Sequence, residues 1–350
     1  MKSTRTSQIT MEFEPLDLMT AHPFGISYGT SAAHPNILVK LQYKDHVGYG
    51  ESSPAPYHNE TPDTVRSLLQ QWQNEEILGD DPFAIAEMLQ RLDRHVAGNN
   101  AAKAGVEMAM QDLAGKIAGQ PVYKLLGLSG LSQPITDFTI GIDSLEMIEK
   151  KTREAVEAGY KVLKVKQGTA YDKEIIARVR KVAPDMPLRV DANSAWTPKQ
   201  AIAMAKFLFE HNVQFIEQPL AKHAPIADWQ LVREHSPLPI FADESISRST
   251  DVARLAGVID GVVVKLQKTG GLMEALKVIH VARAHSLQIM FGCMIESSLG
   301  VTAAAQLQSL VDYLDLDGAL LLANDPFVGA RYDDGFLRLT DLPGLGVTRR

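Results

Sequence analysis

The fold is decided by five short stretches between residues 162 and 266: VLKVKQG (162–168), RVDAN (189–193), FIEQP (215–219), FADES (241–245) and VVVKL (262–266). Each is a run of apolar residues interrupted or ended by a charged residue, which predicts parallel strands buried on both faces. The steps from Lys166 to Asp191, Glu217, Asp243 and Lys265 are 25, 26, 26 and 22 residues, enough for a crossover helix and a return strand. We therefore expect a (β/α) barrel with these side chains at the carboxyl ends of its strands, where barrels carry their chemistry.

Other patterns flank the barrel. Residues 5–60 alternate as antiparallel strands do, and residues 61–126 repeat apolar residues at helical steps of three and four. The sequence predicts an α+β domain over residues 1–132 and a barrel of eight strands over residues 133–325. Residues 326–350 are predicted to return to the first domain as a strand.

Bulk properties limit the partners and the compartment. With 350 residues, the chain exceeds the usual size of one hydrophobic core. A net charge of −7 gives no electrostatic attraction to nucleic acid or an anionic membrane, so neither is expected as a partner. The chain has no signal-like or membrane-spanning apolar stretch, and its single cysteine, Cys293, excludes an internal disulfide. These features predict a cytoplasmic protein and leave homo-oligomerisation open.

Three carboxylates from consecutive units form a candidate metal site. Asp191, Glu217 and Asp243 would repel one another at one end of the barrel unless a cation neutralised them. Ligation by oxygen alone favours Mg²⁺ over zinc, because no His or Cys stands at an equivalent strand end. The alternative is that each acid caps the helix that follows its strand.

The lysines are candidate acid and base groups. Lys164 and Lys166 are two residues apart on one strand, so their side chains share a face. Two neighbouring ammonium groups lower each other's pKa, which could give a base near pH 7. Lys265 lies four strands further round the barrel and would approach from the opposite side. The alternative for the pair is a solvated edge strand.

These motifs carry a family resemblance that covers nearly the whole chain. KVK, DAN, EQP, DES and VKLQKTGG, preceded by AGVEMAMQDLAGKIAGQPVYKLLG, resemble the muconate-lactonizing subgroup of the enolase superfamily. The resemblance implies a modified (β/α)₇β TIM barrel with an α+β capping domain and one Mg²⁺ per subunit. It also implies removal of a proton α to a carboxylate to give a metal-stabilised enediolate. Carried over by motif, the three carboxylates are the metal ligands, Lys166 and Lys265 the acid/base groups, and Lys164 assists Lys166 and the substrate carboxylate.

The eighth strand favours one reaction within this subgroup. In DYLDLDGALLL (312–322), Asp315 and Asp317 share a face. Dipeptide epimerases carry an Asp-x-Asp at this place that holds the substrate's α-ammonium group. The resemblance thus implies 1,1-proton transfer at the α-carbon of the second residue of an L,L-dipeptide, and the alternative for this pair is two solvated loop acids. It also suggests further substrate contacts, for which ordinary barrel packing is the alternative: Thr139, Cys293, Met294 and Ile295.

Two loops, residues 23–30 and 52–58, are expected to set specificity. The Ala-Glu epimerases present an arginine from the first loop, whereas PFGISYGTS (23–31) contains no Arg or Lys. We therefore predict that an acidic second residue is not preferred. Rival activities on the same scaffold are N-acylamino-acid racemization, o-succinylbenzoate synthesis and muconate cycloisomerization. A catalytically silent barrel that binds a metal or small molecule is a rival of another class.

Overall fold

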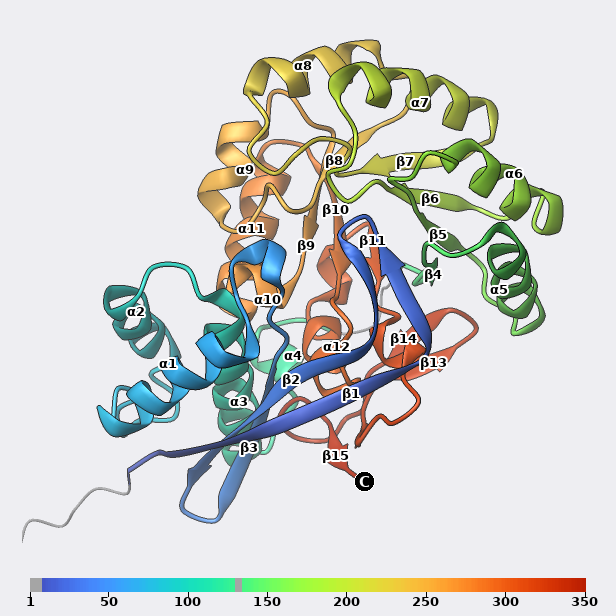
Figure 1. Cartoon of the computed structure of the whole chain (residues 1–350). Coiled ribbons are helices and arrows are strands. Elements are labelled where there is room, and N and C mark those ends of the chain that lie inside the picture. Colours follow the sequence, from blue (N-terminus) through green and yellow to red (C-terminus); the bar gives the residue numbers. More distant parts are fainter. Residues whose placement is uncertain (1–7, 130–133) are drawn as a thin grey trace, which may run out of the picture.

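In the computed structural model, which describes residues 8–129 and 134–350, eight parallel strands form the predicted barrel (Figure 1). Each strand pairs with the next in chain order. An isolated bridge between Thr136 and Leu314 joins the first strand to the last. The strands are β4 (Phe138–Ile140), β5 (Leu163–Lys166), β6 (Leu188–Asp191), β7 (Val213–Glu217), β8 (Ile240–Ala242), β9 (Gly261–Val264), β10 (Gln288–Gly292) and β11 (Tyr313–Asp315).

Helical crossovers connect these strands and cover the outside of the barrel (Figure 1). Their boundaries follow local signals: Pro198 begins α7, and the Thr197 and Gln200 side chains cap it reciprocally. The helices are α5 (Leu145–Glu157), α6 (Asp172–Val182), α7 (Pro198–Glu210), α8 (Ile226–His235), α9 (Ser249–Leu255), α10 (Leu266–Thr269), α11 (Leu272–Ala284), α12 (Ser298–Ala305) and the 3₁₀ turn η2 (Gln308–Leu310). The predicted (β/α)₇β architecture is confirmed.

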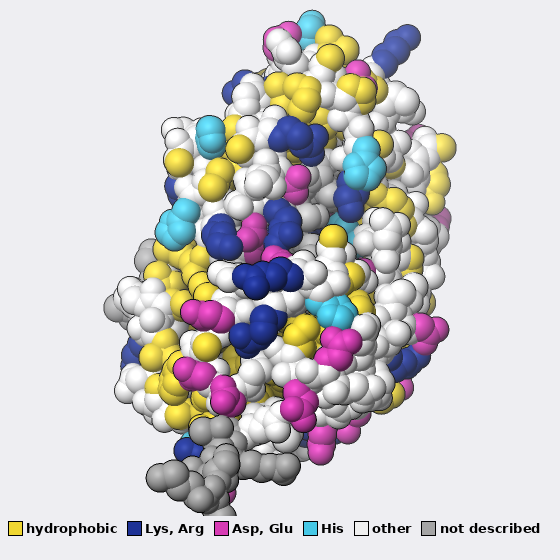
Figure 2. Space-filling view, turned by 90° about the vertical axis from the view of Figure 1, so that its left-hand side faces the viewer, with side chains coloured by type: hydrophobic (Ala, Val, Ile, Leu, Met, Phe, Trp, Pro, Cys, Tyr) yellow, Lys and Arg dark blue, Asp and Glu magenta, His cyan; other side chains and the backbone are white. Residues whose placement is uncertain are grey.

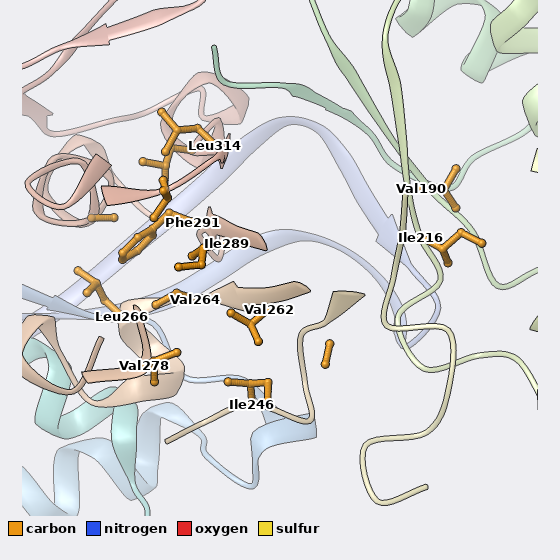
Figure 3. Packing of buried hydrophobic residues seen from close by; sticks show 14 of the residues in the cluster. Val190, Ile216, Ile246, Val262, Val264, Leu266, Val278, Ile289, Phe291 and Leu314 are labelled. Atoms are coloured by element: carbon orange, nitrogen blue, oxygen red, sulfur yellow. The ribbon is translucent and has the colours of Figure 1, made fainter. Parts of the chain in front are cut away.

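Side chains alternate between the helices and the barrel interior. Val190, Ile216, Val262 and Ile289 belong to the large apolar cluster seen in Figure 3. The intervening strand residues turn inward. Four of them form a separate buried cluster: Phe215, Phe241, Val263 and Met290. Arg189 of β6 packs against this cluster and pairs with Asp137 at 2.7 Å, so the interior is filled by apolar side chains and a buried ion pair.

An antiparallel sheet and a helical layer precede the barrel. The sheet pairs in the order β1 (Thr10–Ile26), β2 (Gly29–Tyr43) and β3 (His46–Ser52). The turn η1 (Pro56–His58) and the helices α1 (Pro62–Asn74), α2 (Ile85–His95), α3 (Asn100–Ala118) and α4 (Val122–Leu125) follow. Helix α3 lies close against β3: a Cβ atom at Gly50 would lie 2.0 Å from the carbonyl oxygen of Gly105. The tip of the β1–β2 hairpin reaches the mouth of the barrel (Figure 1).

The chain beyond the barrel returns to the first domain, but in short pieces. The tail comprises η3 (Gly318–Leu321), the paired strands β12 (Phe327–Val328) and β15 (Thr348–Arg349), and a hairpin of β13 (Arg331–Asp333) and β14 (Phe336–Arg338). Gly344 exchanges backbone hydrogen bonds with Gln120 and Val122, so a loop makes this contact where a strand was predicted. The predicted boundary between residues 132 and 133 lies outside the described residues.

The surface carries charges of both signs. Figure 2 shows Asp and Glu side chains standing between the Lys and Arg side chains at the middle of one face. Exposed ion pairs such as Lys150–Glu154 contribute at most about 1 kcal/mol each, so the apolar clusters are the main source of stability. None of the helices in the described ranges is both long enough and apolar enough to span a membrane.

Candidate active site

Three buried carboxylates meet at the carboxyl end of the barrel. Asp191 and Glu217 are the last residues of β6 and β7, and Asp243 directly follows β8. The pairing register places Asp191 opposite Glu217. One carboxylate oxygen of each residue lies within 4.8 Å of the others. The structure thus brings the predicted metal ligands together.

The cluster fits a divalent cation. Among the described residues, neither oxygen of Glu217 takes a hydrogen bond, although the Lys164 Nζ atom lies 2.7 Å from its Oε2 atom. Burial, followed by the charge of Asp191, raises the pKa of Glu217 well above its usual range. Buried carboxylate oxygens without partners are costly, and an all-oxygen set suits Mg²⁺. Asp191, Glu217 and Asp243 could therefore hold Mg²⁺.

Two lysines approach these carboxylates from different parts of the barrel. Lys166 Nζ donates a hydrogen bond to Asp191 Oδ2 at 2.6 Å, and Lys265 Nζ donates one to Asp243 Oδ2 at 2.8 Å. Lys166 ends β5, and Lys265 follows β9. Four strands separate them in an eight-stranded barrel, so they approach the site from opposite sides.

Lys164 lies two residues before Lys166 on β5 and is surrounded by carboxylates. Its Nζ atom is 2.6 Å from Asp315 Oδ2, and the side chain is 1% exposed. Burial lowers the pKa of Lys164, but the charges of Asp315, Glu217 and Asp191 outweigh it and raise the pKa well above its usual range. Burial also lowers the pKa of Lys265, but the charge of Asp243 outweighs it and raises this pKa well above its usual range. At Lys164, therefore, the attraction of the surrounding carboxylates outweighs the repulsion expected from its lysine neighbour.

Sequence analysis missed three residues that hold Asp191 and Asp243 in place through their side chains or backbone. Asn193 N donates to Asp191 Oδ1 at 2.8 Å, and Asp243 N donates to Gln218 Oε1 at 2.7 Å. Lys268 Nζ donates to the carbonyl oxygen of Asp243 at 2.5 Å and also to its carboxylate. Asn193 and Gln218 have φ values of 40° and 37°, a sparsely populated conformation held by these contacts. Asn193, Gln218 and Lys268 lie inside the motifs DAN, EQP and VKLQKTGG, and these motifs could have indicated their importance.

Asp315 and Asp317 both reach the site from the end of β11. Thr139 N donates to Asp317 Oδ2 at 2.7 Å, and Lys164 pairs with Asp315. Burial opposes ionisation of Asp315, but the charge of Lys164 outweighs it and lowers its pKa. Burial and the charge of Asp315 raise the pKa of Asp317 to about 6. Asp317 is therefore the carboxylate whose charge remains to be balanced.

A cavity of about 890 Å³ opens above these groups. Its volume lies within the range of small-molecule sites. It is lined by most of the predicted catalytic and substrate residues: Thr139, Lys166, Lys265, Cys293, Met294, Ile295, Asp315 and Asp317. Lys164 is not among the described lining residues, so a direct contact with substrate is not seen for it.

The two loops expected to set specificity close the cavity and contact each other. The rings of Tyr28 and Tyr57 stack at 4.7 Å, with 9° between their planes. Tyr57 Oη lies 3.3 Å from Met294 Sδ, and Ser27 Oγ donates to the carbonyl oxygen of Asn193 at 2.6 Å. Both tyrosines lie in loops that the sequence had indicated, but their contact depends on the docking of the hairpin.

Cys293 lines the cavity. Its Sγ atom lies 3.3 Å from the carbonyl oxygen of Asp315. Burial, followed by the charge of Asp317, raises the pKa of the thiol well above its usual range. A thiol that stays protonated is a poor nucleophile, so Cys293 contributes shape to the cavity.

The barrel, the carboxylate cluster and the lysines define a class of protein, and comparison with known families agrees. The sequence matches the mandelate racemase / muconate lactonizing enzyme N-terminal domain over residues 10–127 and the enolase C-terminal domain-like family over residues 147–350. This chain belongs to the enolase superfamily.

Its similar relatives include epimerases of dipeptides. It is 40% identical over 343 residues to the L-Ala-D/L-Glu epimerase of Bacteroides thetaiotaomicron, covering 98% of this chain and 88% of that protein. It is 34% identical to the hydrophobic dipeptide epimerase of Roseobacter litoralis, covering 96% of this chain and 98% of that protein. The dipeptide epimerase of Enterococcus faecalis, complexed with Mg and L-Leu-L-Tyr, superposes with a TM-score of 0.92 at 31% identity, covering 98% of this chain and 100% of that one.

Proposed function

We propose that this protein is a Mg²⁺-dependent dipeptide epimerase, an isomerase that inverts the α-carbon of the second residue of an L,L-dipeptide. The observation that carries this proposal is the unbalanced charge of Asp317, beside Asp315, in the same cavity as Lys166 and Lys265. A substrate α-ammonium group would balance that charge with charge-assisted hydrogen bonds. The names of similar relatives support the same reaction.

The lysines would move the proton. As a neutral amine, one of Lys166 and Lys265 takes the α-proton, and the electron pair of the broken C–H bond moves into the carboxylate to give an enediolate. The ammonium of the other lysine then returns a proton to the opposite face. Lys164 fixes Asp315 through its 2.6 Å ion pair and so positions the ammonium site.

Asp191, Glu217 and Asp243 would hold the metal. Mg²⁺, when bound, supplies positive charge that stabilises the negative charge developing on the substrate carboxylate. Asn193 and Lys268 orient two of these ligands through the hydrogen bonds described above.

Solvent exchange tests the proposal. Pooled L,L-dipeptides incubated with the protein and Mg²⁺ in D₂O should gain one dalton, read by mass spectrometry. Lys166→Ala and Lys265→Ala should each leave exchange with only one of the two epimers, because each lysine serves one face. If both variants still exchange both epimers, the two-lysine assignment is wrong.

The substrates of the rival activities differ from a dipeptide in charge. N-acylated amino acids, muconate and succinylbenzoate carry no α-ammonium group, so Asp317 would have no partner in them. Labelling of these compounds, and of no dipeptide, would replace the proposal with one of these reactions. A protein that binds Mg²⁺ but exchanges no proton in any of these compounds would support the silent barrel.

The second residue of the preferred dipeptide is proposed to be neutral or cationic. In the part of the chain that the structure describes, the Lys and Arg side chains lining the cavity are Lys166 and Lys265, and both pair with metal-site carboxylates. The first loop contributes apolar and hydroxyl side chains, among them Phe24, Ile26 and Thr30. We predict a higher kcat/KM for Ala-Ala or Ala-Phe than for Ala-Glu, measured by polarimetry. The reverse order would show that another group binds the acidic side chain.

We also propose a cytoplasmic location for the enzyme. A single cysteine suits the reducing cytoplasm, and the net charge of −7 disfavours nucleic acid and anionic membranes as partners. We retain the division into a capping domain (1–132), a barrel (133–325) and a returning segment (326–350) as part of this proposal.

A further inference from the structure

A second cavity adjoins the main one at the end of β4. It measures about 190 Å³ and lies between β4, helix α5, the turn η3 and the end of β1. Phe24, Thr139 and Leu321 line both cavities, so they form a common wall. We call the smaller cavity the side pocket.

The side pocket is lined mostly by apolar side chains, with His22, Lys151 and Glu154 as its ionisable lining residues. The rings of Phe138 and Tyr160 stack at 4.2 Å, with 16° between their planes, and Leu320 and Ala158 add further apolar surface. Both rings and Leu320 are only half-buried, which leaves apolar area for a ligand to cover. The charged group of Lys151 turns aside to Asp143 Oδ2 at 3.0 Å, so the aliphatic part of this residue lines the pocket.

The common wall lies beside the proposed ammonium site. Thr139 lines both cavities, and its backbone N–H holds Asp317 Oδ2 at 2.7 Å. Leu321 ends the η3 turn, which Asp317 begins as its N-cap. Burial and then the charge of Asp317 raise the pKa of Tyr160. The Asp317 carboxylate is therefore close enough to interact electrostatically with this lining residue of the side pocket.

Geometry then assigns the pocket to one part of the substrate. On the proposed function, on which this inference rests, the α-carbon of the first residue carries both the ammonium group and a side chain. With the ammonium on Asp317, that side chain starts at the common wall. We propose that the side pocket receives the side chain of the first residue, so that the enzyme prefers dipeptides beginning with a large apolar residue such as Leu or Phe.

The size of the effect follows from the apolar area covered. A single methylene group in a hydrophobic pocket is worth about tenfold or more in kcat/KM. Leu-Ala should therefore be epimerised with a kcat/KM at least about tenfold above that of Ala-Ala, measured by deuterium incorporation with Mg²⁺ present. Ala-Leu has the same composition and separates a preference at the second residue from one at the first.

A pair of variants locates the effect in the pocket. Ala158 is an exposed lining residue at the end of α5 with ordinary helical backbone angles, so Ala158→Phe can fill the pocket without disturbing the core. We expect Ala158→Phe to lower kcat/KM for Leu-Ala about tenfold and to leave Ala-Ala within twofold. Val156→Phe, on the exposed surface of the same helix, is the control and should change neither value.

The outcomes separate the two proposals. Equal values for Leu-Ala and Ala-Ala in the unmodified enzyme would overturn the side-pocket assignment and leave dipeptide epimerization intact. The assignment also fails if Ala158→Phe lowers both substrates alike. No labelling of any dipeptide would overturn the proposed function itself.

Discussion

The charge state of a buried side chain in this protein depends on the charged groups around it. Lys164 is surrounded by more carboxylates than lysines and keeps its ammonium charge despite burial. Asp315 is paired with it, whereas burial and the charge of Asp315 raise the pKa of Asp317 to about 6. The two aspartates therefore differ: Lys164 neutralises Asp315, whereas Asp317 is the one that we propose binds the substrate's ammonium group.

This difference predicts that substitution of Asp317 weakens substrate binding. Asp317→Asn should raise KM for a dipeptide at least tenfold with a smaller change in kcat, because it removes the unpaired charge that binds the ammonium. KM of the unmodified enzyme should fall as pH rises through about 6, as the Asp317 carboxyl ionises. Steady-state kinetics between pH 5 and pH 8 would test both. An unchanged KM in Asp317→Asn would remove this residue from the ammonium site.

At the scale of helices and strands, a buried glutamate, Glu107, joins the first domain to the barrel. Glu107 extends from the middle of α3 and accepts a hydrogen bond from Met273 N, at 2.9 Å, in the first turn of α11. Gly271 precedes this turn, and a Cβ atom there would lie 1.6 Å from Glu107 Oε2. Burial raises the pKa of Glu107 to about 7, since the hydrogen bonds it accepts offset only part of the desolvation.

A pH-dependent stability follows from Glu107. Between about pH 4.5 and pH 7 the folded protein holds a proton that the unfolded chain has released, so stability falls as pH rises through this window. Glu51, Glu60 and Glu244 have pKa values raised to about 7 as well, so Glu107→Gln should remove only the contribution of Glu107, up to about 3 kcal/mol. Urea unfolding of both proteins at pH 4.5 and pH 8 would measure the difference.

The matched control for this prediction lies on an exposed helix. Glu234→Gln removes the same charge from the surface of α8, where it accepts a hydrogen bond from Gln230 at 2.8 Å. If Glu107→Gln and Glu234→Gln give the same pH profile, burial of Glu107 does not control it.

At the scale of the whole molecule, the metal site joins three units of the barrel. Asp191, Glu217 and Asp243 come from β6, β7 and the end of β8, and their ligand atoms lie within 4.8 Å of one another only when these strands pair. A cation that binds this arrangement and not the unfolded chain stabilises the fold as a whole.

Metal addition should therefore raise the thermal stability. Mg²⁺ at about 100 times its Kd should add about 2.7 kcal/mol and raise Tm by several degrees, measured by calorimetry against a sample with EDTA. Glu217→Gln should abolish the increase. An equal increase in this variant would place the bound ion elsewhere.

The outer framework of the site could be predicted from local sequence. An apolar run that ends in a charged residue indicates a strand with that residue at its end, and the 22 to 26 residue steps indicate parallel pairing. This reasoning placed Lys166, Asp191 and Glu217 at the ends of β5, β6 and β7, where the structure has them. Lys265 differs slightly, because it caps α10 after the end of β9.

Contacts between distant segments were beyond such reasoning. The ion pair of Lys164 with Asp315 joins the second barrel strand to the eighth across 151 residues, and the side pocket joins β1, β4, α5 and η3. The periodicity of a strand indicates the face on which a side chain lies, but not its distance from a group on another strand.

By itself, then, the sequence determined the barrel, the three carboxylates and the lysines at its carboxyl end, because alternation and spacing are local properties of the chain. Tertiary structure alone decided which acid is neutralised, how Tyr28 and Tyr57 close the cavity, and where a side pocket opens. These features depend on closure of the barrel and docking of the β1–β2 hairpin, which bring together groups that no short stretch of sequence contains.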